Sequence, residues 1–202
     1  MGKGARTRAT ILQAAVETAC LAGFEGLNLQ PLADKVGMTK SGLYAHFGSK
    51  EALQVATLEY AAELFQTRIV APAKTEPAGL PRLVRVFERW LDWPQNAGLP
   101  GNCPFFAGVV EFDDGQGPVR ERLVRLFRDF RAVIEQLVAS ATRHGHLAAG
   151  TDPAQFAHEL LALRYAHHWA HHFMRDPLAL ARTRTAFAKL VGATAPRAAQ
   201  RA

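Results

Sequence analysis

Apolar residues recur at helical spacing along most of the chain, and no segment shows the strict alternation of a half-buried strand. The first helix is predicted over residues 7–22, where one face carries Ile11, Leu12, Ala15, Val16 and Ala19. Similar patterns, separated by glycine, proline and capping residues, predict later helices over residues 50–70, 82–93, 103–112, 118–144, 153–174 and 177–191. The sequence therefore predicts an all-α protein.

Two short helices separated by a tight turn are predicted between residues 28 and 47. Asn28 is a good N-cap for the first and Gly37 ends it, while Thr39 can cap the second. Leu43 and Phe47 lie four residues apart and face inward. The exposed side of this second helix carries Lys40, Ser41, Tyr44 and His46. A two-turn helix is not stable alone, so it must be held by packing, and its polar side is left for an external partner.

The composition is that of a chain with a substantial core and an excess of basic charge. The 202 residues are 49% hydrophobic, and the formal charge of +6 with a pI near 9.7 favours an anionic partner, either nucleic acid or a membrane surface. Cys20 and Cys103 are too few for a disulfide framework or a zinc site, and Cys20 fits a small buried hydrophobe. Neither a signal peptide nor an apolar run of membrane-spanning length is present, so we expect a cytoplasmic protein.

The segment VGMTKSGLYAHFGSKEAL (residues 36–53), with Gly23-Phe24 and Leu32-Ala33 before it, closely resembles the TetR family of bacterial transcriptional regulators. The resemblance covers about residues 6–60. It implies an N-terminal three-helix DNA-binding domain over residues 5–65, with the helix-turn-helix at about 28–47. It also implies a helical ligand-binding and dimerisation domain over residues 67–192, before a tail at 193–202 that we expect to be disordered.

The resemblance also implies which side chains contact DNA: Thr39, Lys40, Ser41, Tyr44, His46 and Lys50. Their chemistry agrees with that role. Hydroxyl groups donate to phosphate oxygens, and Lys50 stands at a helix N-terminus, where its charge and the helix dipole both favour a phosphate. Lysine donates to the O6 and N7 acceptors of guanine, so we expect Lys40 to read a base. Gly42 lets the helix backbone approach the groove, and Gln30 is placed to add a further contact.

For the second domain the resemblance implies a ligand cavity and a dimer. The stretch GNCPFFAGVVEFDDGQGPVRERL (residues 101–123) is similar to a segment of one branch of the family. A largely apolar small effector is expected, and the candidate lining residues are Trp90, Phe105, Phe106, Phe127 and Phe130. The last two long helices are expected to form a four-helix interface with a second copy. We therefore expect a homodimeric repressor, without a cofactor, that a small molecule releases from a palindromic operator.

A histidine cluster offers a metal-responsive regulator on the same scaffold as the alternative function. His167 and His171, like His168 and His172, are four residues apart, so either pair can chelate a metal, with His158 or Cys103 as a distant third ligand. Half-buried histidines at a helix–helix interface are the simpler explanation, and we favour it. The acidic residues Glu111, Asp113 and Asp114 also suggest a cation, but we expect them to end one helix and cap the next.

An enzyme and a ligand-binding protein with a vestigial helix-turn-helix are the remaining alternatives. Gly37 and Gly42 have P-loop spacing, but Leu43 and Tyr44 follow where Lys and Ser or Thr are needed. His158-Glu159 begins an H-E-x-x-H zinc motif, but position 162 is Ala162. We therefore expect no enzymatic activity, and the retained Lys40, Tyr44 and Lys50 argue against a vestigial motif.

Overall fold

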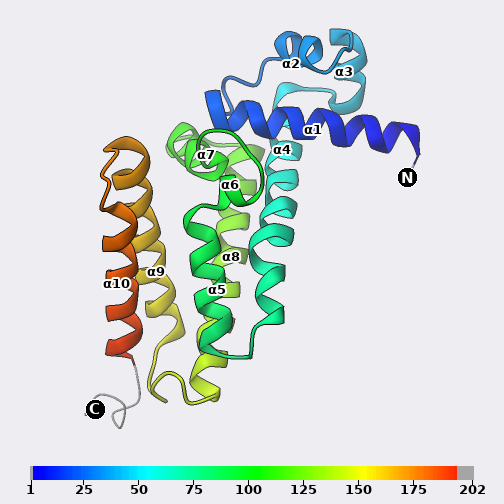
Figure 1. Cartoon of the computed structure of the whole chain (residues 1–202). Coiled ribbons are helices and arrows are strands. Elements are labelled where there is room, and N and C mark those ends of the chain that lie inside the picture. Colours follow the sequence, from blue (N-terminus) through cyan, green and yellow to red (C-terminus); the bar gives the residue numbers. More distant parts are fainter. Residues whose placement is uncertain (1, 195–202) are drawn as a thin grey trace. The chain divides into compact units, whose positions relative to one another are not determined.

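The computed structural model describes residues 2–194, and in this part of the chain helices joined by turns form the whole structure, with no β-strand (Figure 1). The predicted all-α class is thus confirmed. Residues 195–202 of the predicted disordered tail lie outside the described residues. Among the described helices, none combines the length and the apolar character needed to cross a membrane.

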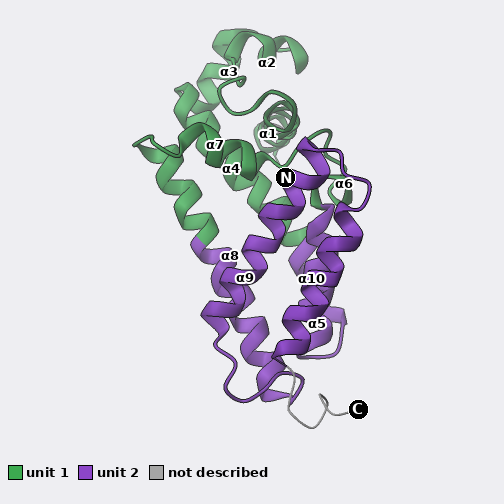
Figure 2. Cartoon of the chain, turned by 90° about the vertical axis from the view of Figure 1, so that its left-hand side faces the viewer, with its two compact units in different colours: residues 1–68, 93–127 green, residues 69–92, 128–202 purple. Residues whose placement is uncertain are grey.

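The chain forms two compact units, and each combines segments that are distant in the sequence (Figure 2). Unit 1 comprises residues 1–68 and 93–127, and unit 2 comprises residues 69–92 and 128–202. The domains expected from the sequence were continuous stretches on either side of residue 66. The structure instead folds residues 93–127 together with the N-terminal helices.

Unit 1 holds the first three helices of the predicted DNA-binding domain, residues 3–47, which we call the head, and the helix that follows them. Its helices are α1 (Lys3–Ala22), α2 (Leu29–Lys35), α3 (Lys40–Phe47), α4 (Lys50–Phe65), α6 (Trp93–Asn96), α7 (Pro104–Phe112) and the first part of α8 (Pro118–Arg143). One core cluster joins Leu43 of α3 and Leu53 of α4 to Val119 and Leu123 of α8. The head is therefore held by residues from the middle of the chain as well as by its own helices.

Unit 2 contains a 3₁₀ turn and the remaining helices. These elements are η2 (Ala71–Thr75), α5 (Leu80–Leu91), the rest of α8, α9 (Pro153–His168), η3 (Trp169–Phe173) and α10 (Ala179–Ala193). The rings of Phe87 on α5 and Phe187 on α10 stack with their centroids 3.9 Å apart. On the surface, Glu88 and Arg184 form an ion pair with an N–O distance of 2.7 Å between the same two helices.

Two predicted helices change their winding before they end. The helix expected over residues 50–70 is α-helical to Phe65 and continues as the π-helix η1 (Gln66–Val70). The helix expected over residues 153–174 likewise passes into the π-helix η3 (Trp169–Phe173). A π-turn shifts the side-chain register by only one residue, so apolar spacing did not distinguish it from α-helix.

The N-caps of α2 and α3 are the predicted residues Asn28 and Thr39, and Ser49 is the N-cap of α4. The Thr39 hydroxyl accepts from the Gly42 N–H, and the Ser49 hydroxyl accepts from the Ala52 N–H. Asn28 occupies the N-cap of α2, as predicted, but its side chain accepts no capping hydrogen bond. An N-cap side chain bonds to the second or third helical N–H. The third residue of α2 is Pro31, which has none.

Candidate DNA-binding surface

Helix α3 places one face in the core of unit 1 and the other in solvent. Leu43 is fully buried, and Phe47 is half-buried against the same core, as their spacing predicted. The next residue, Tyr44, is 52% exposed. Lys40 and Ser41 are exposed on this helix as well. The helix is thus anchored by two apolar residues and presents hydroxyl and ammonium groups outward.

The start of α3 is organised by the Thr39 hydroxyl. Its oxygen lies 3.1 Å from the Gly42 nitrogen, from which it accepts, and 3.3 Å from the Ser41 hydroxyl. A Cβ at position 42 would lie 3.0 Å from the same oxygen, closer than most such contacts. Glycine therefore lets the cap approach the helix closely, besides leaving the outer surface at this point free of a side chain.

Arg8 of α1 fixes the other end of α3, a contact that sequence reasoning missed. Its guanidinium lies 4.6 Å from the centroid of the Phe47 ring, a favourable cation–π distance. One guanidinium nitrogen also donates to the His46 carbonyl oxygen at 3.3 Å. The contact joins residues far apart in the sequence, so no local pattern signals it. His46 itself is half-buried.

Two of the predicted DNA-contacting side chains bond to carboxylates in this structure. The Gln30 amide donates to Asp34 on the next turn of α2 at 2.8 Å. The Lys50 ammonium donates to the carbonyl oxygen of Glu25 at 2.9 Å and to its carboxylate at 3.1 Å. A DNA phosphate at Lys50 would therefore meet an acidic residue already in contact with the ammonium.

A chain of polar side chains connects α2, α1 and α4 behind this surface. Lys35 of α2 pairs with Glu17 of α1 at 3.0 Å, and Gln13 donates to the same carboxylate at 3.0 Å. These hydrogen bonds, first that of Gln13 and then that of Lys35, lower the pKa of Glu17. The Tyr60 hydroxyl of α4 donates in turn to the Gln13 side-chain oxygen at 3.2 Å. The network ties α2 to the helix that follows the head.

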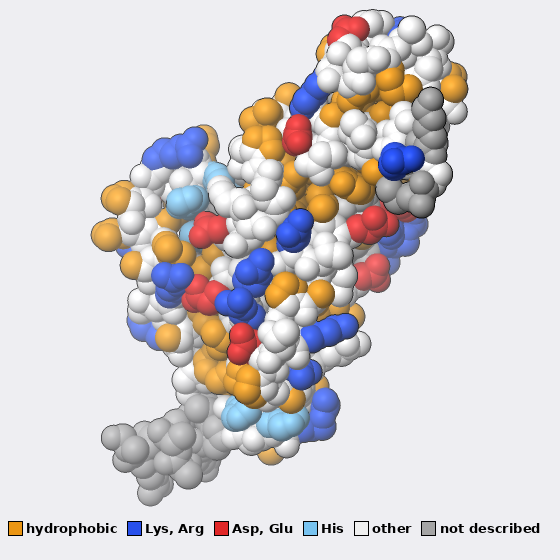
Figure 3. Space-filling view, turned by 45° about the vertical axis from the view of Figure 1, so that its right-hand side comes forward, with side chains coloured by type: hydrophobic (Ala, Val, Ile, Leu, Met, Phe, Trp, Pro, Cys, Tyr) orange, Lys and Arg blue, Asp and Glu red, His pale blue; other side chains and the backbone are white. Residues whose placement is uncertain are grey.

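Basic charge is mixed with acidic charge on the surface. On the face drawn in Figure 3, Lys and Arg side chains lie among Asp and Glu side chains and do not form one continuous basic patch. The positive net charge therefore does not locate a binding surface by itself on this face. The composition of α3 is the more specific indication.

The five aromatic residues predicted to line a ligand cavity fall in both units. Phe105, Phe106 and Phe127 belong to unit 1, and Trp90 and Phe130 belong to unit 2. In unit 1 the Phe105 ring contacts Phe127 edge to face and stacks on Trp93. In unit 2 the Trp90 and Phe130 rings meet at 4.7 Å, nearly perpendicular. These contacts show that at least four of the five residues have packing roles within their own unit.

The histidine cluster forms two pairs on α9 and η3. The rings of His167 and His171 stack with centroids 5.3 Å apart, and those of His168 and His172 lie 4.9 Å apart. Across the part of the chain that the structure describes, no group of three His, Cys, Asp or Glu side chains is placed to hold a metal ion. Cys103 belongs to the other unit, where its sulfur accepts from the Trp93 indole N–H at 3.0 Å.

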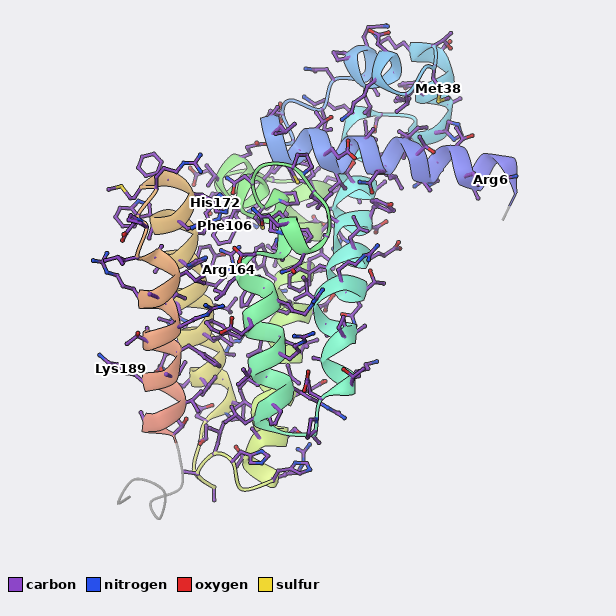
Figure 4. All side chains as sticks on the ribbon, viewed as in Figure 1. Arg6, Met38, Phe106, Arg164, His172 and Lys189 are labelled. Atoms are coloured by element: carbon purple, nitrogen blue, oxygen red, sulfur yellow. The ribbon has the colours of Figure 1, made fainter. Side chains whose placement is uncertain are left out.

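Burial and the charge of Arg164 favour the neutral form of two of these histidines, His167 and His168. Arg164 is almost fully buried on α9, with its Nε donating to the Trp90 carbonyl oxygen, and Figure 4 shows where Arg164 and His172 lie. Burial, followed by the charge of Arg164, lowers the pKa of His167 to about 4 and that of His168 to about 3. His167 also bonds to the Thr183 hydroxyl of α10 at 3.1 Å. His167 therefore has the helix–helix position that we favoured.

One cysteine and two acidic residues singled out from the sequence have clear positions in the structure. Cys20 is buried, as expected, and burial raises the pKa of its thiol to about 12. Asp113 stands at the C-cap of α7, in agreement with its expected place. The Glu111 carboxylate, however, does not cap the next helix: it accepts from backbone N–H groups in the turn between α1 and α2.

Comparison with known proteins gives two family matches that together cover most of the chain. Residues 11–57 match the model described as bacterial regulatory proteins, tetR family. Residues 79–187, more than half of the chain, match the model described as tetracyclin repressor-like, C-terminal domain.

Similar individual proteins agree with these matches. A nucleoid occlusion factor, SlmA, from Cronobacter sakazakii is 29% identical over 141 residues, 69% of either chain. The structure of a TetR-family regulator from Cytophaga hutchinsonii superposes with a TM-score of 0.84 at 19% identity, over 98% of both chains. The structure of AibR in complex with isovaleryl coenzyme A and operator DNA has a TM-score of 0.62 at 23% identity, over 82% of this chain and 85% of that one.

Proposed function

Because the chain belongs to the TetR family of DNA-binding transcriptional regulators, we propose that it is a dimeric repressor released from a palindromic operator by a small-molecule effector. The observation that carries the proposal is the contrast on α3, where Leu43 is fully buried and the adjacent Tyr44 is 52% exposed. A helix held in this way offers its polar side to the major groove.

The DNA-binding residues of the proposal are Gln30, Thr39, Lys40, Ser41, Gly42, Tyr44, His46 and Lys50. Tyr44, Thr39 and Ser41 donate hydroxyl protons to phosphate oxygens, and Lys40 donates to guanine. Lys50 and the N-terminus of α4 together attract a further phosphate. Phosphate contacts supply most of the affinity, and Lys40 supplies sequence preference.

Dimerisation is assigned to α9 and α10 because apolar side chains are exposed where these helices meet. Trp169, Phe173, Met174 and Leu178 are each more than half exposed. They follow one another from η3 to the start of α10. Exposed apolar residues gathered in this way are typical of protein–protein interfaces. Two copies joined here would present two α3 helices to one inverted repeat.

For the effector, the candidate contacts form one set within each unit: Phe105, Phe106 and Phe127 in unit 1, and Trp90 and Phe130 in unit 2. A largely apolar molecule suits either set. The likeness in fold to AibR, whose structure holds isovaleryl coenzyme A together with operator DNA, supports a regulator that binds both kinds of partner. Effector binding would lower DNA affinity by shifting α4, the helix that begins at Lys50.

Selection of binding sites from random-sequence DNA tests the proposal. We expect enrichment of an inverted repeat whose half-sites are about one helical turn apart. Tyr44→Ala should abolish the enrichment, and Lys74→Ala, which removes an exposed lysine from η2, should leave it unchanged. Enrichment of no common motif by the wild-type protein would reject the proposal.

A further inference from the structure

The turn between α1 and α2 is held by the carboxylate of Glu111 on α7. One carboxylate oxygen accepts from the Phe24 N–H at 3.1 Å and the other from the Glu25 N–H at 2.9 Å. Gly23, with a φ of 73°, makes this approach possible, because a Cβ there would lie 1.7 Å from a Glu111 oxygen. The backbone of residues 24 and 25 is therefore fixed by a residue of α7.

The first turns of α4 hold the same turn through other atoms. The Gln54 amide donates to the Phe24 carbonyl oxygen at 3.0 Å. The Lys50 ammonium donates to both the carbonyl oxygen and the carboxylate of Glu25. Two of the three ammonium protons of Lys50 are thus directed to Glu25. A phosphate bound at Lys50 would also lie beside the Glu25 carboxylate, where like charges repel.

We propose that Glu25, held in place by Glu111, competes with DNA phosphate for Lys50. This inference rests on the proposed function, in which Lys50 contacts DNA. The contact is open to exchange because the Glu25 side chain is 68% exposed and that of Lys50 is 37% exposed. Ion pairs at such a surface contribute little, so DNA can displace Glu25, but only at a cost in affinity.

Through Glu25, the availability of Lys50 for DNA also depends on Glu111, a residue from the C-terminal family match. Glu111 lies within residues 79–187, the range matched by the C-terminal family model, yet it folds in unit 1 beside the head. A shift of α7 that weakens the Glu111 bonds would loosen Glu25 and free Lys50. A shift that tightens them would withdraw Lys50 from DNA. Glu111 is therefore a positioning residue that acts through Glu25.

A double-mutant cycle on the full chain tests the competition. Operator affinity is measured for wild type, Glu25→Gln, Lys50→Ala and the double variant at one salt concentration. Glu25→Gln should tighten binding about two- to fivefold when Lys50 is present, the range of a surface ion pair, and have little effect in the Lys50→Ala background. Glu51→Gln is the control: it removes a neighbouring exposed charge, and its effect should be equal in both backgrounds.

The outcomes separate this inference from the function on which it rests. If Glu25→Gln tightens binding equally in both backgrounds, its effect is general electrostatics and the competition is absent. If Glu25→Gln weakens binding, Glu25 supports Lys50 instead of competing with it, and the inference is likewise overturned. If Lys50→Ala alone leaves the affinity unchanged, the proposed DNA contact of Lys50 is what fails, and the competition fails with it.

Glu111→Gln tests the positioning role. Gln keeps one acceptor oxygen and replaces the other with an amide nitrogen, so binding should tighten, by less than for Glu25→Gln, and the two changes should not add. Asp113→Asn removes a nearby exposed charge as a control and should leave affinity unchanged. Thermal unfolding of each variant shows whether the fold is retained. Additive effects, or weaker binding by a folded Glu111→Gln variant, would contradict the positioning role.

Discussion

Helix α3 and the junction of α9 with α10 both expose aromatic side chains, but their neighbours differ. On α3, Tyr44 is accompanied by Lys40 and Ser41, whose polar groups need hydrogen-bonding partners. At the junction, Trp169 and Phe173 stand with other apolar residues. The first surface suits a hydrated, charged partner such as DNA, and the second suits burial against protein. Exposure of aromatic rings alone would not have separated the two roles.

What lies beneath the two surfaces differs as well. Below α3, Leu43 packs in an apolar core, and Arg8 holds Phe47 by a cation–π contact. Beside the apolar junction, His167 is buried against α10 in its neutral form, close to the buried Arg164. DNA binding by the α3 surface should therefore depend mainly on salt concentration. The stability of the fold around the junction should also depend on pH, through His167.

The largest expected effect is on self-association. Phe173→Glu combined with Trp169→Glu places two charges on the apolar surface of each copy, and a buried unpaired charge is strongly unfavourable. We expect the dimer to weaken by about a hundredfold or more, as for removal of interface hot spots. Sedimentation over a concentration series measures this. Val110→Glu changes an exposed apolar residue of α7 and is the control. An unchanged dimer would place the interface elsewhere.

The next effect is on stability in acid. The pKa of His167 is lowered from 6.5 to about 4, so between these values the unfolded chain binds a proton that the folded chain does not. The free energy of unfolding should fall as the pH drops from about 6.5 towards 4, by on the order of 2–3 kcal/mol from this residue. His167→Gln should flatten that slope in urea unfolding at fixed protein concentration. His158→Gln, an exposed change on α9, should not.

Local signals in the sequence predicted much of the head. The hydroxyl of Thr39 caps α3 as expected, since a cap depends on residues within one turn. The inward positions of Leu43 and Phe47 follow from helical spacing. Asn28 stands at the N-cap of α2 as predicted, but its side chain accepts no capping hydrogen bond, and Pro31 removes one of the two N–H groups that could donate it.

Contacts between distant residues were not predictable in the same way. The bonds of Glu111 to residues 24 and 25, and of Lys50 to Glu25, join helices whose relative placement depends on the whole of unit 1. Aromatic composition likewise suggested one ligand site, whereas the structure distributes those residues between two units with their own packing contacts. Residue type indicated the chemistry in these cases, but only the fold identified the partners.

A smaller effect is expected on sequence preference. Lys40→Ala removes the donor that we assign to guanine and should cost roughly 1–3 kcal/mol of operator binding, with relaxed preference at one base position. Affinities for the selected operator and for single-base variants measure both changes. Equal reductions at every position would instead make Lys40 a phosphate-binding residue.

The smallest expected effect is on the salt dependence of binding. Lys50→Ala should reduce the slope of log affinity against log salt concentration by about one unit for each phosphate that Lys50 neutralises. Binding titrations across a salt series give the slope, with Lys74→Ala as the control. An unchanged slope would mean that Lys50 stays with Glu25 in the complex.

The most direct test of α3 as the DNA-reading helix is methylation interference at guanine N7 on the selected operator. Methylation should block the wild-type protein at a symmetric pair of guanines, one in each half-site, because N7 faces the major groove. With Lys40→Ala, methylation of that pair should no longer interfere, while interference at other positions remains. An identical pattern for both proteins would contradict the assignment of Lys40, and an absence of major-groove interference would contradict the role of α3 itself.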